Sequence, residues 1–185
     1  IVDAFRWMAQ ARHIGKIVLT HRPALWRGKI LQDGAYLVTG GLGGIGRKVA
    51  EWLATQGAGH IALIGRTPAS GEAGEWLAAQ QDAGAPMANY VANIAEPAST
   101  AALLEQVRAT GMKVRGIFHA AGLLDDGLIQ NQTWSRFATV LAPKAAGALN
   151  LQNATAGDPL DHFVLFSSGS SILGNMGQAN YAAAN

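Results

Sequence analysis

A short apolar segment that leads straight into a glycine cluster is the feature that most constrains how this chain can fold. Residues 35–38 are apolar, and the cluster behind them places Gly41, Gly43 and Gly46 in the spacing G-x-G-x-x-G. A helix-forming segment, residues 47–56, follows. A strand, a tight glycine turn and a helix in this order form a dinucleotide-binding unit, because glycine lets the backbone turn sharply and approach a pyrophosphate without a Cβ.

The same cluster also fits a second glycine spacing, T-G-x-x-x-G-x-G, which starts at Thr39. The free N–H groups and the dipole of the following helix favour an anion there. A glycine-rich loop without a ligand is the alternative, but the strand before the cluster and the helix after it lie where the motif requires them. We therefore expect the cofactor to contact Thr39, Gly40, Gly41, Leu42, Gly43, Gly44, Ile45 and Gly46.

From residue 34 onward, segments typical of strands alternate with segments typical of helices. We expect strands at 36–39, 61–64, 87–92, 114–120 and 163–166, and helices at 45–56, 72–83, 99–110 and 134–153. Crossover connections of this kind make the strands parallel and place helices over both faces. The prediction is an α/β, doubly wound parallel sheet of the Rossmann type, with a buried middle formed by Val38, Leu63, Ile64, Ile117, Val164 and Leu165.

The composition excludes several classes of protein. With 49% hydrophobic and 14% charged residues, the 185-residue chain has enough apolar surface for a compact core. A net charge of +2 is too small and too scattered to predict binding to nucleic acid or to a membrane surface. No apolar run reaches the roughly 18 residues of a membrane span, and no signal peptide is visible. The absence of cysteine excludes disulfides and leaves the compartment open, with a cytoplasmic protein as our expectation.

The residues that follow the second predicted strand determine which nucleotide is expected. A Rossmann site for NAD carries Asp or Glu about 20 residues past the last glycine, on the ribose. In this chain the region ends with Arg66 and has no carboxylate. A guanidinium suits a 2′-phosphate, so we expect NADPH, with a solvated turn residue as the alternative interpretation of Arg66. Asn93, after the third strand, is expected near the adenine.

Two residues beyond the fifth strand resemble the active site of short-chain dehydrogenases/reductases. Ser168 and Tyr181 stand 13 residues apart, which is the Ser/Tyr relation of that family. Most of its members have a lysine four residues after the tyrosine, where this chain has Asn185. The only lysine after Lys113 is Lys144. This exchange of lysine and asparagine resembles the ketoreductase domains of modular polyketide synthases and of animal-type fatty acid synthases.

The resemblance covers about residues 34–185, and it is specific because several segments agree with it together. These segments are 39–46, 119–122, 124–127, 143–148 and 177–181. It implies further cofactor contacts from the residues after the fourth strand, Ala120, Ala121 and Gly122.

The resemblance also implies a role for each polar residue of the site. Tyr181 would donate a proton to the β-carbonyl oxygen and would also contact the cofactor. Lys144 would supply the cation that a phenol with a pKa of about 10 needs, and would hold the nicotinamide ribose. Ser168 would hydrogen-bond the ketone, and Asn185 would hold a water that relays protons to Tyr181. The alternatives are that Tyr181 only packs against its neighbours, that Ser168 only forms a turn and that Lys144 is a solvated surface residue.

The implied substrate is a β-ketoacyl chain on the phosphopantetheine of an acyl carrier protein, and the implied product is the β-hydroxyacyl thioester. In the family, Leu-Asp-Asp at residues 124–126 marks enzymes that make the D-configured (B-type) alcohol, which places Asp126 near the substrate entrance. The other interpretation of this segment is the N-terminus of a helix with acids that suit its dipole.

Residues 1–20 resemble the C-terminal end of the enoyl reductase domain of polyketide synthases, with an N-terminal arm as the alternative. We expect residues 21–33 to be a linker and residues 34–185 to be a C-terminally truncated ketoreductase domain of a homodimeric synthase, which turns over slowly or not at all by itself. Two other functions stay open. The first is a non-catalytic structural half-domain, which the intact glycine loop and Tyr181 disfavour. The second is a free-standing alcohol dehydrogenase, which residues 1–20 and the lysine–asparagine exchange disfavour.

The five histidines do not stand at metal-ligand spacing and no acids cluster with them, so we expect no catalytic metal. His119 ends the fourth predicted strand. It is expected to pack or to bond the backbone rather than to act as an acid or base.

Overall fold

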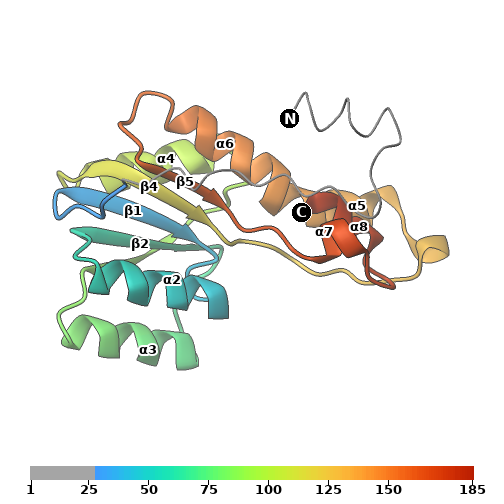
Figure 1. Cartoon of the computed structure of the whole chain (residues 1–185), viewed down its shortest axis with the longest axis horizontal. Coiled ribbons are helices and arrows are strands. Elements are labelled where there is room, and N and C mark those ends of the chain that lie inside the picture. The colour runs from blue at the N-terminus through green and yellow to red at the C-terminus, as the bar shows by residue number, and fades with distance from the viewer. Residues whose placement is uncertain (1–27) are drawn as a thin grey trace, which may run out of the picture.

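Five parallel strands form the centre of the molecule in the computed structural model, which describes residues 28–185 (Figure 1). The strand order is β3-β2-β1-β4-β5, with strands β1 (Gly34–Thr39), β2 (His60–Gly65), β3 (Met87–Val91), β4 (Lys113–His119) and β5 (His162–Leu165). The enoyl reductase resemblance of residues 1–20 and most of the expected linker lie outside the described residues. The predicted doubly wound parallel sheet is confirmed.

Helices cover both faces of this sheet (Figure 1). One face carries α2 (Gly44–Thr55) and α3 (Gly71–Asp82), and the other carries α4 (Pro97–Arg108) and α6 (Gly147–Ala154). Beyond the carboxyl edge of the sheet lie three short helices, α5 (Trp134–Leu141), α7 (Ser170–Leu173) and α8 (Ala179–Ala184), and a single 3₁₀ turn, η1 (Ile129–Asn131). Within residues 28–185, no helix combines the length and the apolar character that crossing a membrane requires.

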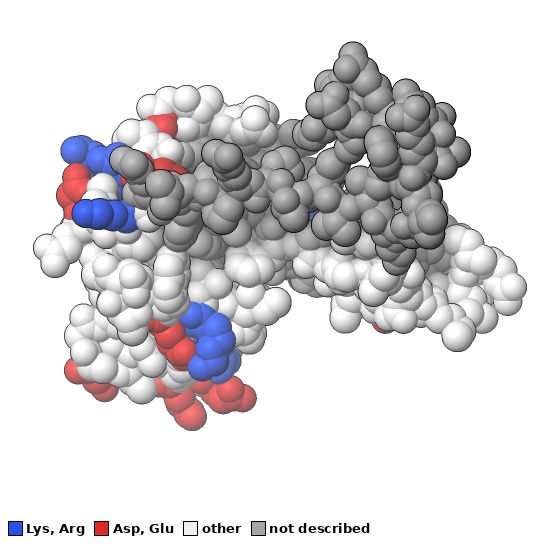
Figure 2. Space-filling view, viewed as in Figure 1, with Lys and Arg blue, Asp and Glu red and all other residues white. Residues whose placement is uncertain are grey.

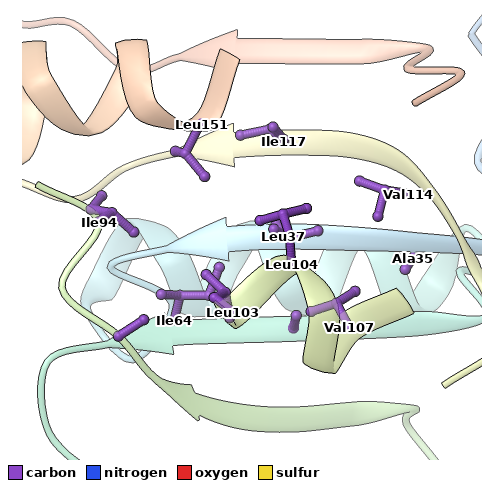
Figure 3. Packing of buried hydrophobic residues seen from close by; sticks show 12 residues of the cluster. Ala35, Leu37, Ile64, Ile94, Leu103, Leu104, Val107, Val114, Ile117 and Leu151 are labelled. Atoms are coloured by element: carbon purple, nitrogen blue, oxygen red, sulfur yellow. The ribbon is translucent and has the colours of Figure 1, made fainter. Parts of the chain in front are cut away.

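Each face of the sheet has its own apolar core. On the α4 and α6 face, Leu37 and Ile117 from the strands meet Leu104 and Leu151 from the helices, all of them fully buried (Figure 3). Burying such a side chain contributes roughly 1.5–3 kcal/mol. These layers fix the carboxyl ends of the strands, from which the site is built.

One part of the expected core is wrong. Val38, Leu63, Ile64 and Ile117 are buried as predicted, Val164 is half-buried against the core, and Leu165 is 52% exposed. The reason is the strand order, because β5 is the last strand of the described sheet and has a neighbour only on its β4 side. A strand in this position is less covered by helices than the central strands.

Charged side chains contribute little to this arrangement. In Figure 2, basic and acidic atoms lie next to one another in small mixed groups. Lys113 pairs with Asp33 near the start of β4, and Lys48 pairs with Glu51 on α2. Exposed pairs of this kind contribute about 0–1 kcal/mol each, so the fold depends mainly on the apolar layers.

The long helix expected at residues 134–153 is interrupted. Pro143 has no N–H and its ring clashes with the preceding turn, so a regular α-helix cannot continue through it. A π-helical turn, η2 (Ala142–Ala146), joins α5 to α6, and the Gly147 N–H bonds the Ala142 carbonyl five residues back. Lys144 lies in this turn, and π-turns inside helices frequently occur at functional sites.

Candidate active site

The glycine loop closes the carboxyl end of β1. Gly40 has a φ of +65°, and a Cβ there would lie 3.0 Å from the Ala121 Cα and 3.1 Å from the Ala120 carbonyl carbon. Gly46, in the first turn of α2, is so close to the loop that a Cβ would lie 2.2 Å from the Gly40 carbonyl oxygen. Only glycine permits the turn at Gly40 and this approach of α2.

The eight predicted contacts of the loop divide into an inner and an outer group. Gly41 is buried and Leu42 packs against the core, whereas Gly43, Gly44 and Ile45 are exposed. The first N–H groups of a helix have no intrahelical acceptors. Among the described residues, no side chain caps α2, and its first turn carries no acidic residue. This end of α2 therefore fits an anion such as a pyrophosphate.

A cavity lies at the carboxyl ends of the strands, beside the point where the strand order reverses between β1 and β4. Ligands of open α/β sheets bind at such a point. Six of the predicted cofactor contacts line the cavity, namely Thr39, Gly40, Arg66, Asn93, Ala121 and Gly122. Arg66 is exposed and has no ion-pair partner within residues 28–185, so its guanidinium is available to a phosphate. The cavity and the uncapped end of α2 together fit a dinucleotide.

Lys144 extends from η2 over the ends of β4 and β5. Its Nζ donates a hydrogen bond of 2.7 Å to the Phe166 carbonyl, and its Cε lies 3.1 Å from the place that a Cβ on Gly122 would take. Burial lowers the pKa of its amine. A second, smaller cavity is lined by Lys144, Phe166 and Asn185. The side chain is thus directed into the site and not into bulk solvent.

Tyr181 and Asn185 share α8 and its end. The Asn185 Nδ2 donates to the Tyr181 carbonyl at 2.8 Å, one helical turn back, and the Ser167 hydroxyl donates to the Asn185 carbonyl at 2.7 Å. Asn185 therefore joins α8 to the end of β5 and reaches the cavity that holds Lys144.

Ser168 lies in the turn that leads from β5 to α7, where its Oγ accepts a hydrogen bond of 3.2 Å from the Ser170 N–H. Within residues 28–185, the Tyr181 hydroxyl makes no hydrogen bond to Ser168 or Lys144. The structure thus brings Lys144 and Asn185 together at one cavity, and places Tyr181 and Ser168 on the elements next to it.

His119 connects the strands to the backbone of Lys144. Its Nδ1 lies 2.7 Å from the Thr39 hydroxyl and its Nε2 lies 3.2 Å from the Lys144 carbonyl. A carbonyl can only accept, so Nε2 carries the proton and Nδ1 accepts from Thr39. The Thr39 oxygen in turn accepts from the Ala121 N–H at 3.2 Å. Burial lowers the pKa of His119 and keeps the ring neutral. The predicted backbone-bonding role of His119 is confirmed.

This buried neutral histidine predicts a loss of stability in acid. Because the folded pKa of His119 is lowered, the unfolded chain binds more protons below a pH of about 6.5, and the stability present above that pH is lost as pH falls through the folded pKa. His60, whose pKa burial also lowers, adds to the loss. The free energy of unfolding, measured with urea at pH 7.5 and 5.5, should fall less between these pH values in His119→Gln and in His60→Gln than in wild type. If the variant with both substitutions loses as much free energy of unfolding as wild type, the prediction is wrong.

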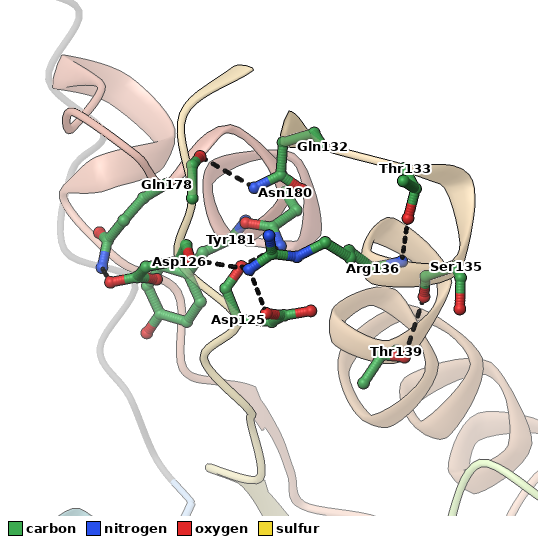
Figure 4. A network of polar contacts seen from close by, with 11 residues as sticks. Asp125, Asp126, Gln132, Thr133, Ser135, Arg136, Thr139, Gln178, Asn180 and Tyr181 are labelled. Carbon is green, nitrogen blue, oxygen red and sulfur yellow. Dashed lines mark hydrogen bonds and ion pairs between the residues drawn. The ribbon is translucent and has the colours of Figure 1, made fainter. Parts of the chain in front are cut away.

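The Leu124–Asp126 segment does not begin a helix, so that interpretation is wrong. The Asp126 carboxylate accepts a 2.9 Å hydrogen bond from Gln178, and the Asp125 carboxylate pairs with Arg136, which lowers the pKa of Asp125 (Figure 4). The sequence did not predict Arg136 or Gln178. The Asp126–Gln178 contact spans 52 residues, so no local spacing indicates it. Within residues 28–185, no three His, Asp or Glu side chains are grouped to hold a metal ion.

Comparison with known protein families agrees with this geometry. The model of the KR domain family matches residues 34–185. The chain belongs to the KR domain family. KR domains are the ketoreductases of polyketide synthases and are oxidoreductases of the short-chain dehydrogenase/reductase type that bind a nicotinamide cofactor. The ketoreductase resemblance is thereby confirmed.

Curated relatives of this KR domain are polyketide synthases. One component of the phenolphthiocerol/phthiocerol polyketide synthase of Mycobacterium tuberculosis is 39% identical over 194 residues, which cover 99% of this chain and 9% of that protein. The spectinabilin polyketide synthase system protein NorB of Streptomyces orinoci is 45% identical over 185 residues, which cover 98% of this chain and 8% of that protein. The chain therefore spans less than a tenth of the length of these relatives.

Solved structures give the same family. An N-terminal ketoreductase from the macrolactin assembly line has a TM-score of 0.76 and 43% identity, over 82% of this chain and 31% of that one. An A-type ketoreductase from a modular polyketide synthase has a TM-score of 0.78 and 36% identity, over 91% of this chain and 36% of that one.

Proposed function

We propose that this KR domain binds NADPH and reduces a β-ketoacyl thioester, carried on the phosphopantetheine of an acyl carrier protein, to the D-configured (B-type) β-hydroxyacyl thioester. The observation that carries the proposal is the placement of Lys144. Its ammonium is held by the Phe166 carbonyl in a cavity that Asn185 also lines, and Asn185 lies one helical turn after Tyr181 on α8. A cation in this place serves a phenol that must release a proton near neutral pH.

The residues of the chain perform the proton chemistry. When bound, the nicotinamide supplies the hydride that adds to the β-carbonyl carbon. Tyr181 donates a proton to the carbonyl oxygen, which completes the alcohol, and the Lys144 ammonium stabilises the phenolate that remains. Ser168 donates a hydrogen bond to the oxygen as negative charge develops on it. Hydrogen bonds among catalytic groups often tighten only around the substrate.

Asn185 completes this proton path. Its Oδ1 is buried and has no hydrogen-bond partner among the described residues, while its Nδ2 is committed to the Tyr181 carbonyl. A buried oxygen of this kind calls for a donor. In the proposal, a water beside Lys144 donates a hydrogen bond to Asn185 and relays a proton from bulk solvent to Tyr181.

The surrounding synthase is part of the proposal. The alignment with the mycobacterial synthase covers 99% of this chain, so it extends into residues 1–33. In the proposal, residues 1–20 are the end of a preceding enoyl reductase domain and residues 21–33 a linker, in a homodimeric, cytoplasmic synthase. The test is to supply the full-length parent polypeptide with NADPH and a β-keto diketide thioester. Formation of the D-alcohol supports the proposal, whereas no reduction, or formation of the opposite alcohol, refutes the reductase or the B-type assignment respectively.

NADPH preference is expected to depend on Arg66. The exposed guanidinium would lie on the 2′-phosphate, and an aspartate in its place would repel the phosphate and accept a hydrogen bond from a ribose hydroxyl. Titration should give a lower dissociation constant for NADPH than for NADH in the parent, and the reverse order in its Arg66→Asp variant. A parent without preference for NADPH would contradict the assignment. Arg115→Asp, at the opposite end of the sheet, is the charge-matched control.

A further inference from the structure

We propose that Arg136 on α5 is a positioning residue for the substrate, because it fixes residues 125–127 against the helix that carries Tyr181. The inference deepens the proposed function and rests on it. Residues 120–128 belong to no helix or strand, so no regular pattern of backbone hydrogen bonds holds them in place. Carbonyl groups in such a segment need other donors.

Arg136 supplies these donors from a single nitrogen. Its Nη2 lies 2.8 Å from the Asp126 carbonyl and 3.3 Å from the Asp125 carbonyl, and it pairs with the Asp125 carboxylate (Figure 4). A Cβ on Gly127 would lie 2.8 Å from the Arg136 Nη1, so the guanidinium packs directly on the backbone of Gly127. One side chain thus holds three consecutive residues. An exposed ion pair alone contributes little, but bonds to two carbonyls fix the path of the backbone.

The same segment is bound from the other side by α8 and the residues before it. Asn180 is fully buried; its Nδ2 donates to the Asp125 carbonyl at 2.7 Å and its Oδ1 accepts from the Tyr181 N–H at 2.8 Å. The Gly127 N–H donates to the Gly177 carbonyl at 2.7 Å. The Asp125 carbonyl therefore accepts hydrogen bonds from both Arg136 and Asn180, and Asn180 also bonds the backbone N–H of Tyr181.

This position makes the segment part of the substrate path. It begins directly after Gly122 and Leu123, which line the cofactor cavity, and it ends against the helix of Tyr181. A ketone that meets both the nicotinamide and the phenol must therefore pass beside residues 124–127. Displacement of the segment would change how the ketone is oriented. Tyr181, the proton donor, and the residues of the cofactor cavity would stay in place, because other contacts hold them.

The test uses the full-length parent polypeptide, NADPH and a β-keto diketide thioester, with the variants Arg136→Met and Arg136→Lys. For Arg136→Met we expect the KM of the thioester to rise by about tenfold and the share of the minor alcohol enantiomer to increase, since a displaced segment would bind the ketone less tightly and admit its second orientation. We expect kcat to change by less than about threefold, because Tyr181 and Lys144 are untouched. Arg136→Lys should recover part of the loss, since one ammonium nitrogen can donate to the same oxygens.

Arg108→Met is the matched control. Arg108 also bonds a carboxylate and a carbonyl, those of Asp158 and Ala154, but it lies on α4 away from the site. It should leave KM and the enantiomer ratio as in wild type. Gly127→Ala, which displaces the guanidinium without removing it, should reproduce Arg136→Met if that variant does not fold.

Three results separate this inference from the proposed function. A wild-type parent that reduces the thioester, with an unchanged KM and enantiomer ratio in Arg136→Met, overturns the inference alone. A fall in kcat at constant KM also overturns it, since Arg136 would then act on the chemistry. A wild-type parent that does not reduce the thioester overturns the proposed function and this inference with it. Combination with Asn180→Ala should be non-additive, because both side chains hold the Asp125 carbonyl.

Discussion

Replacement of Tyr181 by phenylalanine is expected to reduce ketone reduction by a factor of about 10² to 10⁴ in kcat, the usual contribution of a positioned general acid. The phenylalanine ring preserves the packing of α8 but has no proton to give to the carbonyl oxygen. Without that proton, hydride addition would leave an alkoxide in the site, which the Ser168 hydrogen bond alone stabilises poorly. Binding of NADPH should survive, since the cofactor cavity lies at the ends of β1 to β4.

The measurement is the steady-state rate of NADPH oxidation by the full-length parent with a β-keto thioester, together with the dissociation constant of NADPH. Tyr90→Phe is the control, because it removes one hydroxyl that bonds His60 on the β3 side of the sheet. It should leave the rate unchanged. A Tyr181→Phe variant that reduces the thioester at the wild-type rate would show that the proton comes from another group.

The sheet could be predicted from the sequence because its signals are local. Each strand is a short apolar run, each helix has apolar residues at helical spacing, and glycine or proline separates them. The prediction fails where tertiary structure decides. Leu165 has the same apolar character as Leu63, but β5 has a strand on one side only in the described sheet. Pro143 is visible in the sequence, yet only the structure shows that a π-helical turn joins α5 to α6 there.

The candidate site shows the same division. The glycine loop, Arg66 and Asn93 could be predicted because parallel strands bring their carboxyl ends to one edge. Gly122 and Lys144 were predicted from the resemblance of the chain to a family and not from their spacing. The polar bonds that orient these residues, from His119 to Lys144 and from Asn180 to the Tyr181 backbone, were not predicted in detail. They join elements that are distant in the sequence, and any histidine or asparagine could form them.

Lys144→Met is expected to lower kcat by about 10² or more, since methionine keeps the apolar stem but removes the cation. The pH dependence should change with it. Burial lowers the pKa of the Lys144 amine, so this amine loses its charge at a lower pH than an exposed lysine does. In the parent, kcat should therefore fall as pH rises through this lowered pKa. Lys144→Met should lose this alkaline fall together with most of the maximal rate.

The profile of kcat against pH in the full-length parent, at saturating NADPH and thioester, distinguishes this role from a structural one. A variant that merely loosens the fold would lower the rate but keep the fall of kcat at alkaline pH. Lys113→Met, which removes an exposed lysine paired with Asp33 at the start of β4, controls for the loss of a positive charge. The same alkaline fall of kcat in Lys144→Met and wild type would show that Lys144 does not act on the reaction. The half-buried ammonium beside Phe166 would then serve only to join η2 to the end of β5.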